Sequence, residues 1–323
     1  MASGVTFQTM NLLNSRRSFL AQATLGLAGL AALPRSWSAP VAALNRAGGP
    51  RVRLGLAAYS FREFMKDSNH ERKLKVDAAK LIDLPAFIDY AADQGCEGVE
   101  LTSYYFPPAV SREYLANLKR HAFLRGVAIS GSAVGNTFAL PDGAKLDAEI
   151  AGVKSWIDHC AAMGAPHLRV FAGDPKGLSK EEAVKQCVRA LRICGDYAAE
   201  RGVMLGVENH GGIVAQAPVL EEIINETNHH WVRVNLDTGN FYSATPYADL
   251  ARLAPYAVNV QFKVEINQVP GGKQPADFAK VIGILRKANY QGFVTLEYEA
   301  EEDPWQAVPR HLKTLRSALD GTK

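Results

Sequence analysis

The stretch LGVENHGG, residues 205–212, is the most informative part of this sequence, because an apolar run ends there on a carboxylate. Val203 to Val207 has the composition of a buried strand, and Glu208 follows at its carboxyl end, before His210 and two glycines. A charged side chain is costly to bury unless an opposite charge neutralises it. Glu208 therefore predicts a functional site at the end of this strand.

Similar apolar runs recur along the rest of the chain. From residue 52 onward, short β-rich runs alternate with amphipathic helical segments. Such alternation is typical of βαβ units and a parallel sheet. The predicted strands are Arg53–Tyr59, Gly98–Leu101, Val127–Ala133, His167–Phe171, Val203–Glu208, Val232–Asp237, Ala257–Lys263 and Gly292–Glu297. These units predict an α/β protein with a single (β/α)8 TIM barrel, which typically takes about 250 residues. A doubly wound sheet is the alternative, but no G-x-G-x-x-G turn follows the first strand.

The connections carry signals of their own. Several helical segments, such as REYLANLKRHAFLRG and EEAVKQCVRALRICGDYAAERG, end in glycine just before the next strand, as helix C-caps do. Residues 60–82 form a long polar loop after the first strand. This loop either covers the mouth of the barrel or is a solvated excursion.

The first 43 residues differ from the rest, because they contain three arginines and no Asp, Glu or Lys. The motif SRRSFL precedes an uncharged stretch, which resembles a bacterial twin-arginine export signal. This stretch is shorter than the about 20 apolar residues that a membrane span needs, so no stable span is expected after its removal. We predict an export signal over residues 1–43, cleaved after Ala43 or Ser38, and a periplasmic or extracytoplasmic barrel over residues 44–323. A retained or disordered N-terminal anchor is the alternative.

Replacing Arg16 and Arg17 with lysine is expected to keep the precursor in the cytoplasm, because the twin arginine is the feature that identifies the export route. Cell fractionation followed by immunoblotting measures the result. Unchanged export of the double variant would mean that another signal directs this chain.

The predicted signal also accounts for the formal net charge of the chain, which is +3. Without its three arginines, 33 Lys and Arg residues stand against 33 Asp and Glu residues. A chain without net positive charge gives no reason to expect a nucleic-acid partner. The four cysteines, none of them in a CxxC pair, are expected to be small buried hydrophobic residues.

Polar side chains lie on four consecutive predicted strands. Glu208 ends the fifth, Asp237 the sixth (VRVNLDTGNF) and Glu297 the eighth (GFVTLEYEAEE), and Gln261 lies on the seventh (VNVQFKVE). Active sites of barrels form at these carboxyl ends, so four oxygen donors converge there. Three carboxylates in one dry pocket repel one another unless they are protonated or neutralised. Oxygen donors suit a hard divalent ion, so we predict one Mn²⁺ or Mg²⁺, with Co²⁺ and Zn²⁺ left open.

The alternative is that each carboxylate pairs with a Lys or Arg at the rim of the barrel. The metal is the preferred interpretation because three strands end in the same way. Strand alternation adds candidates for substrate binding, because side chains two residues apart share a face. These candidates are His210, Lys263, Arg169 and Glu100, although Arg169 and Glu100 could instead form a structural ion pair across the barrel. The other strand-start and helix histidines, His159, His167, His229 and His230, are interpreted as structural or exposed.

The motifs GCEGVEL, GVENHGG, VNLDTGN, VQFKVE and GFVTLEYE, in this order over roughly residues 52–318, resemble the xylose isomerase-like TIM barrel superfamily. This is the sugar phosphate isomerase/epimerase group. The resemblance implies one divalent metal held by Glu208, Asp237, Gln261 and Glu297, with Glu208 and Glu297 also acting as an acid/base pair. Gln261 departs from the pattern, since histidine is usual there, and this leaves the fourth ligand in doubt.

The resemblance implies an isomerase or epimerase that removes a proton beside a metal-chelated carbonyl of a sugar or keto-sugar. A lyase or dehydratase, or an enzyme that cleaves keto-glycosides through the same enediolate, is the runner-up. A sugar-binding barrel without catalysis is the alternative from another class. Export favours a free or oxidised sugar over a sugar phosphate. A homo-oligomer is left open.

Overall fold

The structure is a computed structural model in which residues 42–69 and 72–321 are described. The predicted export signal lies almost wholly outside these residues, so it stays a prediction. Among the residues described, none of the helices combines the length and the apolar character that crossing a membrane requires.

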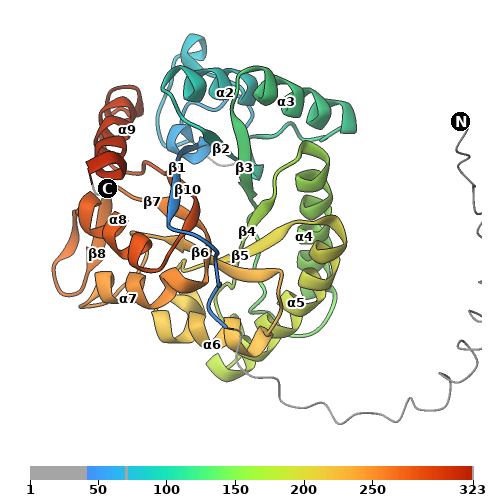
Figure 1. The fold of residues 1–323 in the computed structure, drawn as a ribbon. Helices are drawn as coiled ribbons and strands as arrows, with labels where there is room; N and C mark the ends of the chain where they lie inside the picture. The colour runs from blue at the N-terminus through green and yellow to red at the C-terminus, as the bar shows by residue number, and fades with distance from the viewer. Residues whose placement is uncertain (1–41, 70–71, 322–323) are drawn as a thin grey trace, which may run out of the picture. The chain divides into compact units, whose positions relative to one another are not determined.

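Eight parallel strands close into a barrel in the order β1-β10-β7-β6-β5-β4-β3-β2, with helices around them (Figure 1). The barrel strands are β1 (Arg51–Ala57), β2 (Gly98–Thr102), β3 (Ala128–Ala133), β4 (His167–Phe171), β5 (Met204–Glu208), β6 (Val232–Asp237), β7 (Ala257–Phe262) and β10 (Gln291–Leu296). The predicted (β/α)8 TIM barrel is therefore confirmed, and each predicted strand is present to within two residues at either end.

Helices follow the strands and cover the outside of the barrel. The α-helices are α2 (Leu84–Asp93), α3 (Arg112–Leu124), α4 (Ala144–Met163), α5 (Lys180–Arg201), α6 (Ala217–Thr227), α7 (Pro246–Leu253), α8 (Phe278–Lys287) and α9 (Pro304–Gly321). Short 3₁₀ turns are η1 (Ala58–Phe61), η2 (Ala78–Lys80), η3 (Ser103–Tyr105), η4 (Gly212–Val214) and η5 (Ala254–Tyr256). The apolar faces of the α-helices pack on the sheet, and together they form one continuous core.

The helix ends follow the sequence signals with one difference. Ser179 begins α5 with a capping box to Glu182, and Gly202 ends it in the left-handed conformation at φ 67°. The segment of residues 277–292, which contains α8, does not show the glycine pattern described above. Asn289 adopts the left-handed conformation there at φ 52°, and the glycine of that segment, Gly292, already belongs to β10. Asparagine tolerates this conformation because its short side chain bonds locally.

The loop after β1 is partly core, so the prediction of a long polar loop holds only for its middle. Phe61 and Met65 are fully buried, and Met65 forms a parallel bridge with Ile82. The Phe61 ring lies 4.7 Å from that of Trp305 on α9, centroid to centroid. This aromatic contact fixes the chain directly after β1, where the first side chains of the barrel mouth lie.

A hairpin of β8 (Glu265–Gln268) and β9 (Gly272–Pro275) follows β7, which the strand prediction missed. Its two short antiparallel strands are joined through VPGG, a Pro-Gly turn signal. Because β8 carries only one buried residue, Ile266, the hairpin lacks the apolar alternation by which strands are recognised.

The lower interior of the barrel is filled by a histidine between two glycines. His167 on β4 is buried, and burial lowers the pKa of its ring to about 3, so the ring is neutral. A Cβ atom on Gly206 of β5 would lie 2.4 Å from His167 Nε2, and one on Gly131 of β3 would lie 2.8 Å from Nδ1. His167 therefore has the structural role expected of it, since its ring occupies the space that both neighbouring strands leave free.

Gly206→Ala is expected to lower the free energy of unfolding by about 1–3 kcal/mol, because the added methyl group overpacks the barrel interior. Gly152→Ala on α4 is the matched control, since nothing lies within 4 Å of its Cβ position. Alanine there should stabilise the helix by up to about 1 kcal/mol. Urea unfolding of both variants measures the difference. Equal stabilities would contradict the tight packing around His167.

Candidate active site

The carboxyl ends of the barrel strands surround a cavity of about 200 Å³. Its charged lining consists of Arg169, Glu208, Lys263, Glu297 and Glu299. Its aromatic lining consists of Tyr59, Tyr104, Phe171 and His210. The strand-end rule therefore brings most of the predicted site residues together. Asp237, Gln261 and Glu100 are buried next to this lining and do not belong to it.

Lys263 places its ammonium group among the carboxylates at the mouth. Its Nζ lies 2.7 Å from Glu297 Oε2 and 3.4 Å from Asp237 Oδ2, and it also contacts Glu299 Oε2. The strand order explains this convergence, because β7 lies between β10 and β6. Burial alone would lower the pKa of Lys263, but the carboxylates, Asp237 first, raise it well above its ordinary value. The lysine is therefore charged.

Arg169 on β4 neutralises the carboxylate of Glu208 on β5. Its Nε lies 2.8 Å from Glu208 Oε2, and both side chains are almost fully buried. Asn240 Nδ2 donates a hydrogen bond to the other oxygen, Glu208 Oε1, at 3.1 Å. Burial raises the pKa of Glu208 to about 7, although Arg169 opposes this shift. The ion pair suggested between Arg169 and Glu100 is not formed, because Arg169 pairs with its nearer strand neighbour.

Four buried side chains form a closed hydrogen-bonded ring inside the barrel. Gln261 Nε2 donates to Glu100 Oε1 at 2.7 Å, and Asn259 Nδ2 donates to Glu100 Oε2 at 2.9 Å. Asn235 donates through Nδ2 to Gln261 Oε1 at 2.6 Å, and its Oδ1 accepts from Asn259 Nδ2 at 2.8 Å. Burial raises the pKa of Glu100 to about 7. Glu100, predicted to bind substrate, contacts Gln261 in this ring and does not line the cavity.

The predicted metal ligands do not fit a divalent ion as they are arranged. A cation needs several donors that face one point, but Lys263 lies between Asp237 and Glu297, and Arg169 holds Glu208. The oxygen of Gln261 is bonded to Asn235. Over residues 42–69 and 72–321, no three His, Cys, Asp or Glu side chains are grouped to hold a metal. The alternative interpretation, pairing with Lys and Arg, describes this arrangement.

Three residues of the site were not predicted from the sequence: Tyr59 and Tyr104, which line the cavity, and Asn240, which does not line it but donates to Glu208. Each directly follows a barrel strand or lies within a few residues of its end. The rings of Tyr59 and Tyr104 lie edge to face, with centroids 6.4 Å apart. The strand-end rule finds all three once it is extended from charged residues to aromatic and amide side chains. Phe171 and His210 form the facing wall, with ring centroids 4.4 Å apart.

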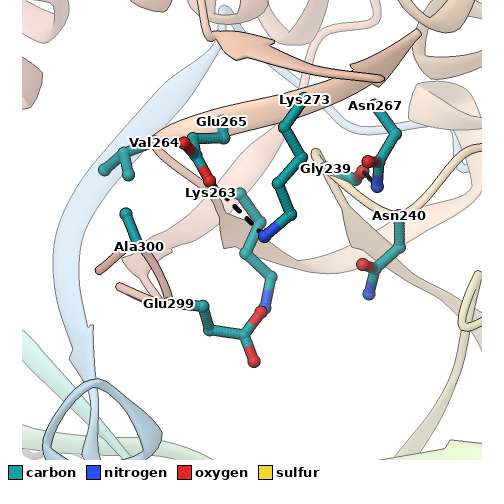
Figure 2. Close-up of a pocket in the computed structure, with 9 residues that line it drawn as sticks. All are labelled: Gly239, Asn240, Lys263, Val264, Glu265, Asn267, Lys273, Glu299 and Ala300. Atoms are coloured by element: carbon teal, nitrogen blue, oxygen red, sulfur yellow. Dashed lines mark hydrogen bonds and ion pairs between the residues drawn. The ribbon is translucent and has the colours of Figure 1, made fainter.

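The hairpin closes a smaller cavity of about 40 Å³ on the far side of Lys263, with room for water but not for a sugar. Figure 2 shows Lys263 reaching Glu299, and Lys273 of the hairpin pairing with Glu265 at 3.5 Å. Lys263 and Glu299 line both cavities and so form the wall between them.

The sequence pattern of the xylose isomerase-like TIM barrel family matches residues 88–315, more than half of the chain. The chain belongs to this family. The resemblance of its strand-end motifs is thereby confirmed. No curated protein matches this family member.

Solved structures with the same barrel include a D-psicose 3-epimerase, with a TM-score of 0.64 and 17% identity over 84% of this chain and 98% of that one. An L-ribulose 3-epimerase has a TM-score of 0.65 and 14% identity, over 84% and 96% of the two chains. The 3-keto-D-glucoside 4-epimerase from E. coli has a TM-score of 0.60 and 16% identity, over 83% and 100%. At these identities the likeness establishes the fold.

Proposed function

We propose that this family member is an isomerase or epimerase that moves a proton beside the carbonyl group of a sugar or keto-sugar. The observation that carries this proposal is the pair Glu208 and Glu297, which face one cavity from β5 and from the end of β10. Two strands, β6 and β7, separate them in the barrel. Two carboxylates on different sides of a bound substrate can take a proton and return one.

The environment of Glu208 suits a general acid or base. A catalytic group works best when its pKa is near the working pH, and burial raises the pKa of Glu208 to about 7. Arg169 and Asn240 hold its carboxylate in one orientation. Lys263 holds the carboxylate of Glu297 in place. It also adds a positive charge where the oxygen of an enediolate would develop.

The cavity favours a small neutral polyol. Its volume of about 200 Å³ is below the roughly 300–1,000 Å³ of drug-sized sites. Three carboxylates against two cations in the lining disfavour a phosphorylated or other anionic substrate. The rings of Tyr59, Tyr104 and Phe171 offer apolar faces for the C–H groups of a sugar. The epimerases among the similar folds are consistent with this class of substrate.

Solvent exchange tests the proposal. The purified protein is incubated in D₂O with a panel of keto-sugars and 3-keto-glycosides, and deuterium beside the carbonyl is followed by NMR and mass spectrometry. We expect incorporation into at least one substrate and the appearance of its epimer or isomer. Binding of a keto-sugar without any exchange would instead identify a sugar-binding barrel and overturn the proposal.

A further inference from the structure

We propose that the ammonium group of Lys263 takes the place of the divalent metal, so that this barrel works without a metal ion. Lys263 contacts two of the four predicted ligands, Asp237 and Glu297, and also Glu299. Its side chain is only 8% exposed, and those of Asp237 and Glu297 are 0% and 6% exposed, so these two contacts lie inside the protein. Figure 2 shows the end of the Lys263 side chain directed toward the carboxylate of Glu299.

The remaining two predicted ligands are also engaged. Glu208 has Arg169 on one oxygen and Asn240 on the other. Gln261 is a member of the buried ring, where its amide nitrogen donates to Glu100 and its oxygen accepts from Asn235. All four groups thus have partners from within the chain.

Glutamine at position 261 explains why a lysine can neutralise these carboxylates in place of a metal ion. A metal-ligating histidine gives one ring nitrogen to the metal and donates the other N–H to a carboxylate. Glu100 is such a carboxylate, but glutamine uses both ends of its amide within the ring. Glutamine therefore keeps the supporting contact to Glu100 and withdraws the donor that a metal needs.

Lys263 would act as a fixed positive charge in the reaction, a role that rests on the proposed function. A carboxylate takes the proton from the carbon beside the carbonyl, the C–H electron pair forms a carbon–carbon double bond, and the π electrons of the carbonyl move onto its oxygen. The ammonium group stabilises that oxyanion, and return of a proton to carbon restores the carbonyl without an oxidant or reductant. Glu299, whose side chain is 34% exposed, is the partner of Lys263 that a substrate oxygen can replace.

Metal binding by the whole protein tests this inference without any substrate. The wild type is compared with the double variant Gln261→His/Lys263→Met, in which histidine can face the space that the ammonium leaves while it still donates to Glu100. Lys154→Met is the control, because Lys154 lies on α4 against the ring of Tyr197. Elemental analysis, titration calorimetry with Mn²⁺ and Zn²⁺, and melting temperatures with and without EDTA are the measurements.

We expect the wild type and Lys154→Met to hold no stoichiometric metal and to melt at the same temperature in EDTA and in Mn²⁺. The double variant should bind Mn²⁺ or Zn²⁺ at least about 10–100-fold more tightly than the wild type. One tightly bound divalent ion per wild-type chain would overturn the inference, and this measurement decides even if the double variant does not fold. Proton exchange by a metal-bound wild type would overturn the inference and leave the proposed function intact. A metal-free wild type that exchanges no protons would overturn the proposed function and leave the inference about the metal intact.

Discussion

Glu297→Gln is expected to lower the rate of solvent proton exchange into a keto-sugar by a factor of about 10²–10⁴, the range that general acid–base catalysis contributes. The substitution keeps the shape of the side chain and an oxygen that can accept from Lys263, but it removes the group that carries the proton. Lys263 also keeps its contacts to Asp237 and Glu299, so the fold should tolerate the change. Exchange is followed by NMR in D₂O.

The control for this variant is Glu302→Gln, which changes an exposed ion pair with Arg310 in the same way. It should exchange protons at the wild-type rate. Binding of the substrate to Glu297→Gln, measured by calorimetry, separates a lost proton transfer from a lost binding site. If Glu297→Gln kept at least half of the wild-type exchange rate, Glu297 would have no part in the chemistry.

Arg169→Met is expected to destabilise the fold by about 3–5 kcal/mol, because it leaves the buried Glu208 without its ion-pair partner. Both side chains are less than 5% exposed, so little water reaches the carboxylate that is left without its partner. The variant also loses the hydrogen bond from Arg169 to the carbonyl of Val134, at 2.9 Å. Urea unfolding measures the free energy of unfolding, of which domains have only about 5–15 kcal/mol.

The double variant Arg169→Met/Glu208→Gln should recover part of this loss, because the uncompensated charge is removed together with its partner. Arg310→Met is the matched control, since its pair with Glu302 is about half exposed and should contribute no more than about 1 kcal/mol. A loss for Arg169→Met as small as that of the control would mean that Glu208 is neutral in the folded protein.

The barrel could be predicted from the sequence because its signal is local and repeated. Each buried parallel strand is an apolar run such as Val203 to Val207, and each helix has its own caps, such as Ser179 and Gly202. The β8–β9 hairpin, which the strand prediction missed, has four exposed residues in β9 and so lacks that pattern. The gathering of strand-end residues around one cavity followed directly from the topology of the barrel.

The order of residues along each strand specifies which side chains reach the mouth of the barrel, whereas their pairing arises only when the barrel closes. Lys263 and Gln261 lie two residues apart on one strand end, yet one enters the cavity wall and the other the buried ring. Charge balance is a property of groups that are distant in the chain, since Lys263 meets Asp237 and Glu297 only in the closed barrel. A carboxylate at a strand end looks the same in a sequence whether a metal or a lysine neutralises it, because its electrostatic energy depends on distances that only the fold sets.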